Sequence, residues 1–363
     1  MKEIYPNPIN TLRTLAILCV FLLHVTIFES PELYLNGDWT FVFMTPAWAG
    51  VWILFIIAGY LGGKGFADER YKMGVGGGIS YILKKFRNVW LPTMFFVLLI
   101  TILCYPTFFI DNKILYQFFI LTYNGSPGVD GIGSTWFVFT IMWLYILTPF
   151  VCSILNRIKS KHTLLLILCG TIIAGLVYRI LSLDAGLNWY DLVYTSPLGN
   201  MDLYFSGVLT SYILKDLSFK SNNYLKMIST FNIFALVFIN SWLYYEEQYE
   251  IYRYYLPTIY ILICLLFIFS FKDSKRRKEL TPKIIFKNPL TFIDWFAGIS
   301  FEFYLFHSIV LYKISPYLTN WSSLTNHFIL ITTSFVISCT FAYAFSRIFK
   351  KTSKNISENW SNP

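Results

Sequence analysis

The sequence predicts an all-α, polytopic integral membrane protein with about ten transmembrane helices and one short re-entrant or interfacial segment. Hydrophobic residues make up 56% of the 363 residues, and charged residues make up only 13%. Soluble domains carry about 25% charged residues, so this chain has too few to cover a surface exposed to water. Aromatic residues reach 20%, which fits long apolar helices with rings at the membrane boundary. The same composition excludes disorder, a coiled coil and nucleic-acid binding, despite a net charge of +9.

Ten stretches have the length and apolar character of a transmembrane helix, because a bilayer core of ~30 Å needs about 20 apolar residues. The predicted spans are residues 9–28, 46–63, 88–105, 134–155, 163–181, 199–214, 227–244, 254–271, 296–316 and 327–346. An eleventh apolar run, at 114–123, is too short to cross, and we predict that it is re-entrant or lies on the outer surface. Residues 1–349 then form one membrane domain, and 350–363 form a short cytoplasmic tail.

The distribution of charge supports ten crossings with both termini in the cytoplasm. If Met1 lies inside, the predicted inner segments hold 24 of the 29 lysines and arginines. The predicted outer loops hold one, Lys113, together with ten acidic residues. Cytoplasmic loops carry the excess of Lys and Arg in membrane proteins. A full crossing at 114–123 would reverse every later loop and destroy this pattern.

Once the predicted loops are subtracted, six ionised residues remain inside the predicted spans or, for Arg253, directly at the start of one, although a charge near the bilayer centre costs at least ~2.5 kcal/mol. Three of them lie near outer helix ends, where a long side chain can reach the interface: Arg179, Arg253 and Lys313. The others, Arg13, Asp202 and Glu302, lie about one turn inside the boundary. Either these three pair with one another and fix helix packing, or they belong to a site.

Two of the four histidines, His24 and His307, fall well inside predicted spans, where an imidazole needs a polar partner. Arg13 and His24 are 11 residues apart, and a rotation of about 100° per residue returns them to one helix face, ~16 Å apart. The guanidinium suits a phosphate or carboxylate that arrives from the cytoplasm. The imidazole lies further out and suits a general base acting on a hydroxyl. The pattern suggests chemistry conducted across the bilayer.

Six sequence blocks, spread over most of the chain, are N-T-L-R-T-L-A-I-L-C-V-F-L-L-H (Arg13, His24), W-I-L-F-I-I-A-G-Y-L (Gly59), K-K-F-R-N-V-W-L-P (Lys84, Lys85, Arg87), S-T-W-F (Trp136), M-D-L-Y-F-S-G (Asp202, Gly207) and I-S-F-E-F-Y-L-F-H (Ser300, Tyr304, His307). Together these blocks resemble the acyltransferase 3 family of integral membrane acyltransferases. The chain departs from the family at Ala58, where a serine is usual before the glycine, and in the basic run, where the family often has arginine.

The resemblance implies transfer of an acyl group, usually acetyl from cytoplasmic acetyl-CoA, to a hydroxyl of an extracytoplasmic or lipid-linked polysaccharide such as a capsule. The protein would then be a multi-pass protein of the bacterial cell membrane, surrounded by lipid, with no metal and no nucleic-acid partner.

Roles for individual residues follow from the same resemblance. His24 acts as a general base or carries the acyl group briefly, and Arg13 assists it. His307 orients His24, binds the thioester or helps with protonation. Four cations at the cytoplasmic entrance suit the phosphates of coenzyme A: Arg13, Lys84, Lys85 and Arg87. The expected substrate-binding residues are Trp136, Asp202, Glu302 and Tyr304.

Two other functions fit parts of the sequence. An exporter of polysaccharide or lipid-linked sugar also has many helices with intramembrane charges, although the two halves of this chain show no visible inverted repeat. A non-enzymatic scaffold of a glycan-assembly complex would make the stripe of Arg13 and His24 a packing feature. Replacement of His24 distinguishes the three functions. An acyltransferase should lose the acyl groups while polymer export survives, an exporter should lose export itself, and a scaffold should leave the product unchanged.

Overall fold

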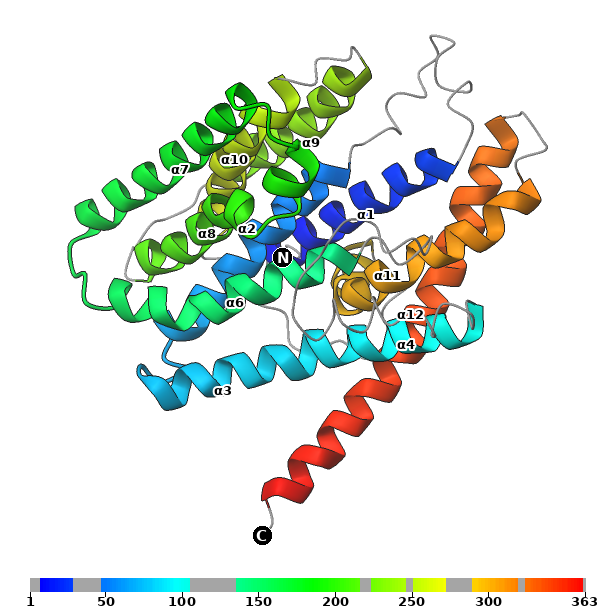
Figure 1. The fold of residues 1–363 in the computed structure, drawn as a ribbon, viewed down its shortest axis with the longest axis horizontal. Coiled ribbons are helices and arrows are strands. Elements are labelled where there is room, and N and C mark those ends of the chain that lie inside the picture. Colours follow the sequence, from blue (N-terminus) through cyan, green and yellow to red (C-terminus); the bar gives the residue numbers. More distant parts are fainter. Residues whose placement is uncertain are drawn as a thin grey trace.

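The computed structural model describes residues 7–28, 47–104, 135–215, 223–245, 251–271, 289–318 and 324–361, and these ranges contain helices and no strand. Nine helices within them are long and apolar enough to cross a membrane. They pack side by side as a bundle (Figure 1). The protein is therefore an all-α, multi-pass membrane protein, as the composition predicts. The short apolar run at 114–123 lies outside the described residues.

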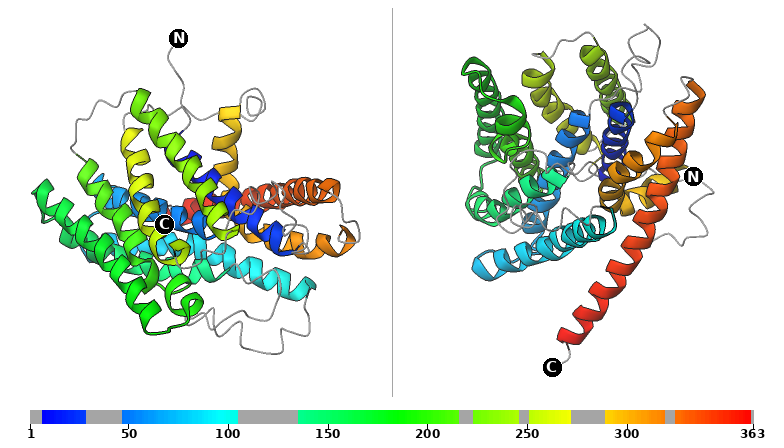
Figure 2. Two further views of the ribbon diagram at one scale, coloured as in Figure 1. Left: turned by 90° about the horizontal axis from the view of Figure 1, so that it is seen from above. Right: turned by 45° about the vertical axis from the view of Figure 1, so that its right-hand side comes forward.

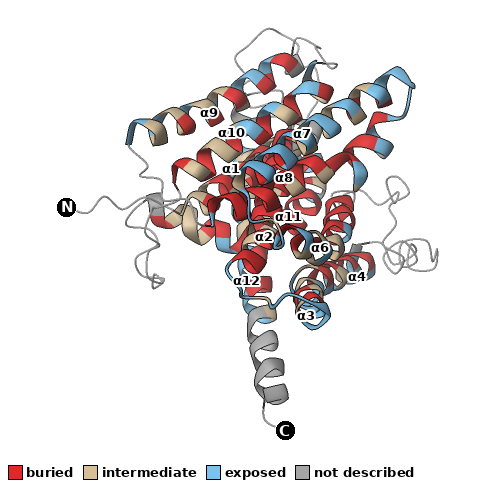
Figure 3. Ribbon diagram, turned by 90° about the vertical axis from the view of Figure 1, so that its left-hand side faces the viewer, coloured by how far each residue is buried: buried red, intermediate tan, exposed pale blue. Residues whose placement is uncertain are grey.

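Each predicted span overlaps a described helix, and several helices run further than predicted. The helices are α1 (Pro8–Phe28), α2 (Ala47–Ala67), α3 (Val75–Lys85), α4 (Leu91–Cys104), α6 (Trp136–Leu155), α7 (Lys161–Asp184), α8 (Met201–Leu214), α9 (Asn223–Tyr245), α10 (Leu256–Ser270), α11 (Pro289–Leu318) and α12 (Leu324–Ser361). Large apolar side chains such as Phe150 and Phe231 remain exposed on the outer helices, as expected for a surface in contact with lipid. Figure 3 shows the more buried α2, α8 and α11 among the more exposed α7 and α9.

The helix predicted over 88–105 begins earlier than expected. It starts as α3 at Val75, and a π-helical turn, Phe86–Trp90, joins α3 to α4. The predicted loop over 64–87 is therefore largely helical, because α2 also continues to Ala67. A span predicted from apolar length alone ends where the charged residues begin, whereas the backbone hydrogen bonds of a helix continue beyond that point. At the other end of the chain, α12 extends to Ser361, through most of the predicted tail over 350–363.

The helix predicted over 199–214 is the short, internal α8. Nearly all of its side chains are buried, and it packs against α2 in the middle of the bundle. Two glycines allow the close approach. A Cβ atom at Gly59 would clash with the Tyr204 carbonyl, and one at Gly207 would clash with the Ile56 carbonyl. These two glycines belong to the sequence blocks described above, and their role here is helix packing.

Helices α1 and α11 lie side by side in parallel, although nearly the whole chain separates them (Figure 2). The Asn10 side chain donates to Asp294 at 2.7 Å, Arg13 donates to the Ala297 carbonyl at 3.5 Å, and His24 contacts His307 at 2.7 Å. Each of these pairs is separated by 283 or 284 residues in the sequence. This constant offset sets the polar stripe of α1 against that of α11.

Candidate functional site

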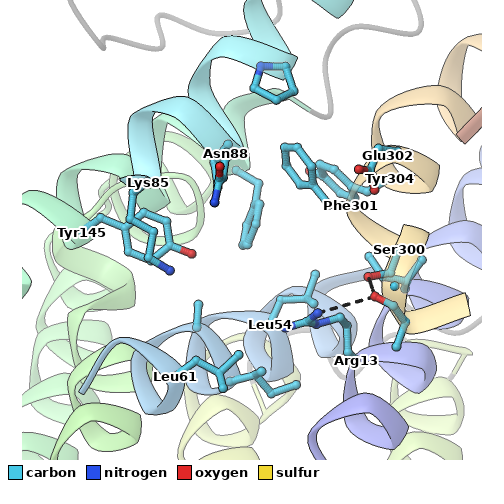
Figure 4. A pocket seen from close by; sticks show the side chains of 18 of the residues that line it. Arg13, Leu54, Leu61, Lys85, Asn88, Tyr145, Ser300, Phe301, Glu302 and Tyr304 are labelled. Atoms are coloured by element: carbon cyan, nitrogen blue, oxygen red, sulfur yellow. Dashed lines mark hydrogen bonds between the residues drawn. The ribbon is translucent and has the colours of Figure 1, made fainter. Parts of the chain in front are cut away.

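A cavity of about 870 Å³ lies between α1, α2, α6, α11 and the turn that joins α3 to α4. Figure 4 shows Lys85 and Asn88 on one side of it, with Arg13, Ser300, Glu302 and Tyr304 across from them. The charged groups of its lining are Arg13, Lys85, Arg87 and Glu302. Its apolar wall includes Ile17, Leu54, Ile57, Ala58, Leu61 and Phe137. The cavity thus combines an excess of positive charge with a long apolar surface.

The π-helical turn Phe86–Trp90, together with the last residue of α3, positions the cations of the cavity other than Arg13. Such turns widen a helix by one residue and are frequent at functional sites. Arg87 and Asn88 line the cavity from this turn, and Lys85 lines it from the last position of α3, directly before the turn. The Lys85 ammonium lies 4.2 Å from the centroid of the Tyr145 ring, a cation–π contact that holds it against the wall. The Arg87 Nε donates to the Asn88 side-chain oxygen at 3.4 Å.

Arg13 enters the cavity from α1. Its Nη1 donates to the Ala297 carbonyl at 3.5 Å, and the Ser300 hydroxyl donates to the same carbonyl at 2.9 Å. Glu302 and Tyr145 interact with the guanidinium electrostatically. Within the described part of the chain, no carboxylate forms an ion pair with Arg13. Because a guanidinium carries five N–H donors, Arg13 retains donors for an anionic ligand.

The two intramembrane histidines form a direct pair. His24 Nδ1 lies 2.7 Å from His307 Nε2, and the two ring centroids are 4.8 Å apart. His307 Nδ1 lies 2.7 Å from the Tyr304 carbonyl oxygen, and His307 is 1% exposed. The backbone of α11 therefore holds the His307 ring of this pair in place.

The hydrogen bonds assign the tautomers of the neutral rings. A carbonyl oxygen only accepts, so His307 Nδ1 carries a proton and donates it to Tyr304. His307 Nε2 then carries the lone pair and accepts from His24 Nδ1. His24 Nε2 is consequently the unprotonated nitrogen of its ring. This is the arrangement of a general base whose second nitrogen is held by an orienting partner.

Tyr304 connects the cavity with the histidine pair. It lines the cavity, its ring centroid lies 5.6 Å from that of His307, and it packs 5.6 Å from the cavity residue Phe137. His24 and His307 themselves are not part of the cavity lining. The basic cavity and the histidine pair are therefore neighbouring compartments that meet at Tyr304.

Three of the predicted site residues belong neither to the cavity lining nor to the histidine pair. Lys84 is exposed to solvent and lies over the Tyr71 ring at 5.6 Å, outside the cavity lining. Asp202 accepts a hydrogen bond from Arg179 at 2.7 Å in a buried ion pair. Trp136 does not line the cavity either, and it packs 6.2 Å from Phe137, which does.

The structure also corrects one interpretation and adds residues to the site. Arg179 does not reach the membrane interface, because it is 1% exposed and bonded to Asp202 inside the bundle. Tyr145 and Asn88 line the cavity, although no site role was predicted for them. Asn88 lies within the basic block, so its neighbours offered a signal. Tyr145 is one of 26 tyrosines, and only the fold brings it to Lys85.

Fold and site together define a class of protein: a multi-pass membrane protein with a cationic cavity beside a histidine pair. Among the described residues, no three His, Cys, Asp or Glu side chains lie close enough to hold a metal ion. A family model described as an acyltransferase domain matches residues 8–347. The chain therefore belongs to the acyltransferase 3 family and is a membrane acyltransferase. No curated protein and no solved structure matches the chain.

Proposed function

We propose that this acyltransferase moves an acetyl group from cytoplasmic acetyl-CoA to a hydroxyl of an extracytoplasmic or lipid-linked polysaccharide. It would act in the bacterial cell membrane, with both termini in the cytoplasm. One observation carries the proposal. Three cations expected to bind coenzyme A, Arg13, Lys85 and Arg87, line one cavity, and that cavity ends at Tyr304, which contacts the histidine pair.

The cavity suits the donor in size and chemistry. Its volume of about 870 Å³ falls in the range of roughly 300–1,000 Å³ found for cofactor sites. Arginine and lysine side chains bind phosphate oxygens through charge-assisted hydrogen bonds, so Lys85, Arg87 and Arg13 would hold the phosphates of acetyl-CoA. Its apolar wall, which includes Leu54 and Ile57, would receive the less polar arm that carries the thioester toward Tyr304.

The tautomers suggest how the chemistry proceeds. His24 Nε2 removes the proton of the acceptor hydroxyl as its oxygen attacks the thioester carbonyl carbon. The tetrahedral intermediate then collapses, the carbon–sulfur bond breaks, and the proton on His24 Nε2 passes to the leaving thiolate. The products are the acetyl ester and free coenzyme A. During the step, His307 Nε2 accepts from His24 Nδ1 and stabilises the positive charge on the His24 ring.

The first test compares the cell-surface polysaccharide of cells that carry the wild type or His24→Ala, by proton NMR, at matched protein level. We expect the O-acetyl signals to disappear while the polymer yield stays intact. His162→Ala is the matched control, because His162 is exposed and outside the cavity lining, and its spectrum should match that of the wild type. Loss of the polymer itself would favour an exporter, and an unchanged His24→Ala spectrum would favour a scaffold.

A further inference from the structure

A second cluster of side chains lies next to Tyr304, apart from the cations of the cavity. We call it the aromatic cluster, and it consists of Trp48, Trp136, Trp189, Tyr190, Tyr194 and Arg253. Trp48 and Trp136 stand at the beginnings of α2 and α6. The other rings come from the π-helical turn Trp189–Tyr194. Arg253 comes from a similar turn, Ile251–Tyr255, that precedes α10. Four separate segments thus converge on one place.

The members of the aromatic cluster are in close contact. The rings of Trp189 and Tyr194 are stacked, with centroids 5.0 Å apart. Trp48 lies 4.3 Å from Trp189, and Trp136 lies 4.6 Å from Tyr194. The Arg253 guanidinium carbon lies 5.0 Å from the Trp189 centroid and 5.7 Å from that of Trp48. The cluster therefore presents indole, phenol and guanidinium groups together.

The burial of these rings differs from that of an interfacial aromatic belt, in which tryptophan and tyrosine lie at the headgroup level. Trp136, Trp189 and Tyr194 are 5%, 8% and 5% exposed. Tyr190 is 40% exposed, and Arg253 is partly exposed, so a ligand can approach the cluster from their side. The cluster is thus largely internal, with one accessible side.

The aromatic cluster also reaches the reaction site. Trp136 packs 6.2 Å from Phe137, and Phe137 packs 5.6 Å from Tyr304. The Tyr194 and Tyr304 hydroxyls are close enough to interact electrostatically. Burial raises the pKa of the Tyr194 hydroxyl well above its usual range, and the neighbouring Tyr190 and Tyr304 add to the increase. This phenol therefore stays protonated and available as a donor at neutral pH.

One polar group of the aromatic cluster has no partner among the described residues. The indole nitrogen of Trp189 is buried and makes no hydrogen bond there. An indole N–H can only donate, and a buried donor without an acceptor is unfavourable. A ligand oxygen at this position would satisfy it. The chemistry of the cluster therefore favours a ligand with hydroxyl oxygens and apolar C–H surfaces.

Buried polar contacts fix the backbone that carries the aromatic cluster. The Asn200 side chain donates to the Tyr194 carbonyl at 2.7 Å, and the Thr140 hydroxyl donates to the Thr195 carbonyl. On the other side, Arg179 Nε donates to the Tyr254 carbonyl at 3.2 Å, next to Arg253. Binding sites need this kind of support, because loosely held side chains lose affinity when they are ordered.

We propose that the aromatic cluster is the acceptor subsite and binds a sugar unit of the glycan, with Trp189 and Tyr194 donating hydrogen bonds to its hydroxyls. Arg253 adds further N–H donors. The inference rests on the proposed function, since it assigns the acceptor to one compartment and acetyl-CoA to the basic cavity. Tyr304, which adjoins both compartments, then marks the place where acceptor hydroxyl and thioester meet.

The test uses the purified full-length protein in lipid nanodiscs, with acetyl-CoA and oligosaccharides released from de-O-acetylated surface polysaccharide. Trp189→Phe keeps an aromatic ring to stack on Tyr194 and removes the N–H together with the five-membered ring of the indole. We expect the KM for the oligosaccharide to rise about tenfold, as for the loss of one hydrogen bond, with the KM for acetyl-CoA unchanged. Tyr190→Ala, at a more exposed position, should also raise the oligosaccharide KM and carries less risk to folding.

The matched control is Trp143→Phe, because Trp143 is 40% exposed on α6 and lies outside the aromatic cluster. It should leave both KM values as in the wild type. An unchanged oligosaccharide KM in both Trp189→Phe and Tyr190→Ala would overturn the subsite. Tryptophan fluorescence titration with the oligosaccharide alone separates the two proposals. Binding by the wild type that Trp189→Phe weakens, without any acetyl transfer, would support the subsite and contradict the proposed reaction.

Discussion

Arg13 and Arg179 both lie within long apolar helices, yet their surroundings differ. Arg179 is 1% exposed, and it donates to Asp202 at 2.7 Å, to the Thr258 hydroxyl at 3.1 Å and to the Tyr254 carbonyl at 3.2 Å. Arg13 is partly exposed and lines the cavity. Within the described residues, its one hydrogen bond goes to the Ala297 carbonyl.

The two arginines show that the partners of a guanidinium inside the bundle distinguish a structural role from a ligand-binding role. A guanidinium whose donors are bound to protein joins helices, and Arg179 joins α7 to α8 and to the turn before α10. Gly175 permits this contact, since a Cβ atom there would clash with the Asp202 carboxylate. A guanidinium that faces a cavity with donors to spare can instead bind a ligand. Arg13 has that position.

The largest effect is expected from Arg179→Met. The substitution leaves the Asp202 carboxylate buried without its cation, and breaking a buried ion pair in this way costs ~3–5 kcal/mol. We expect little folded protein and a much lower unfolding temperature. Fluorescence-detected size exclusion after heating measures both in detergent extracts.

The double variant Arg179→Met/Asp202→Leu is the control for this prediction. Replacing both partners by apolar residues removes the uncompensated charge, and such replacements are often neutral for stability. The double variant should therefore recover most of the folded protein. If it stays as unstable as the single variant, the loss comes from packing rather than from the unpaired carboxylate.

An effect of intermediate size, on the KM for acetyl-CoA, is expected from Arg13→Gln. Loss of a hydrogen bond to a charged group costs about 1.5–3 kcal/mol, so the KM for acetyl-CoA should rise roughly 10- to 100-fold. The unfolding temperature should change little, because no buried carboxylate loses an ion pair. Initial rates of coenzyme A release at varied acetyl-CoA give the KM.

Arg13→Lys sharpens the same prediction. A lysine keeps the charge and lacks the planar fork that binds two phosphate oxygens at once, so its KM should fall between those of the wild type and Arg13→Gln. A normal KM in folded Arg13→Gln would place Arg13 with Arg179, as a packing residue.

Much of the fold was predictable, because composition and helix length decide it. Nine of the helices appear as long apolar segments, and the helix predicted over 199–214 is present as α8. The parallel pairing of α1 with α11 was not predictable, since no local pattern specifies a contact across 283 residues. The helix predicted over 88–105 starts already at Val75, as α3. This start was not predicted, because the length of an apolar segment gives no information about helix outside the membrane.

The site was predictable in its residue types and less so in their arrangement. The spacing of Arg13 and His24 placed both on one face of α1, and the structure sets that face against His307 and the cavity. The partner of Asp202 was not evident, because Arg179 lies on another helix and resembled an interfacial residue. Pairing depends on how helices pack, and the sequence of one helix does not contain that information.

The smallest predicted change in the KM for acetyl-CoA concerns two adjacent lysines of α3. They differ as the two arginines do, because one lines the cavity and the other does not. Lys85 lines the cavity and lies over Tyr145. Lys84 is exposed and lies over Tyr71. Lys85→Gln should raise the KM for acetyl-CoA about fivefold, and Lys84→Gln should change it by less than about twofold, because exposed charges contribute only ~0–1 kcal/mol.

Both lysine variants remove one positive charge from the same segment, so their effects on the general electrostatic attraction of acetyl-CoA are alike. The difference between them then reports contact in the cavity, and it should persist when added salt weakens long-range attraction. Equal KM values for the two variants would mean that the segment attracts the donor by charge alone. In that case the cavity position of Lys85 would carry no role in binding, and Arg13 and Arg87 would hold the phosphates without it.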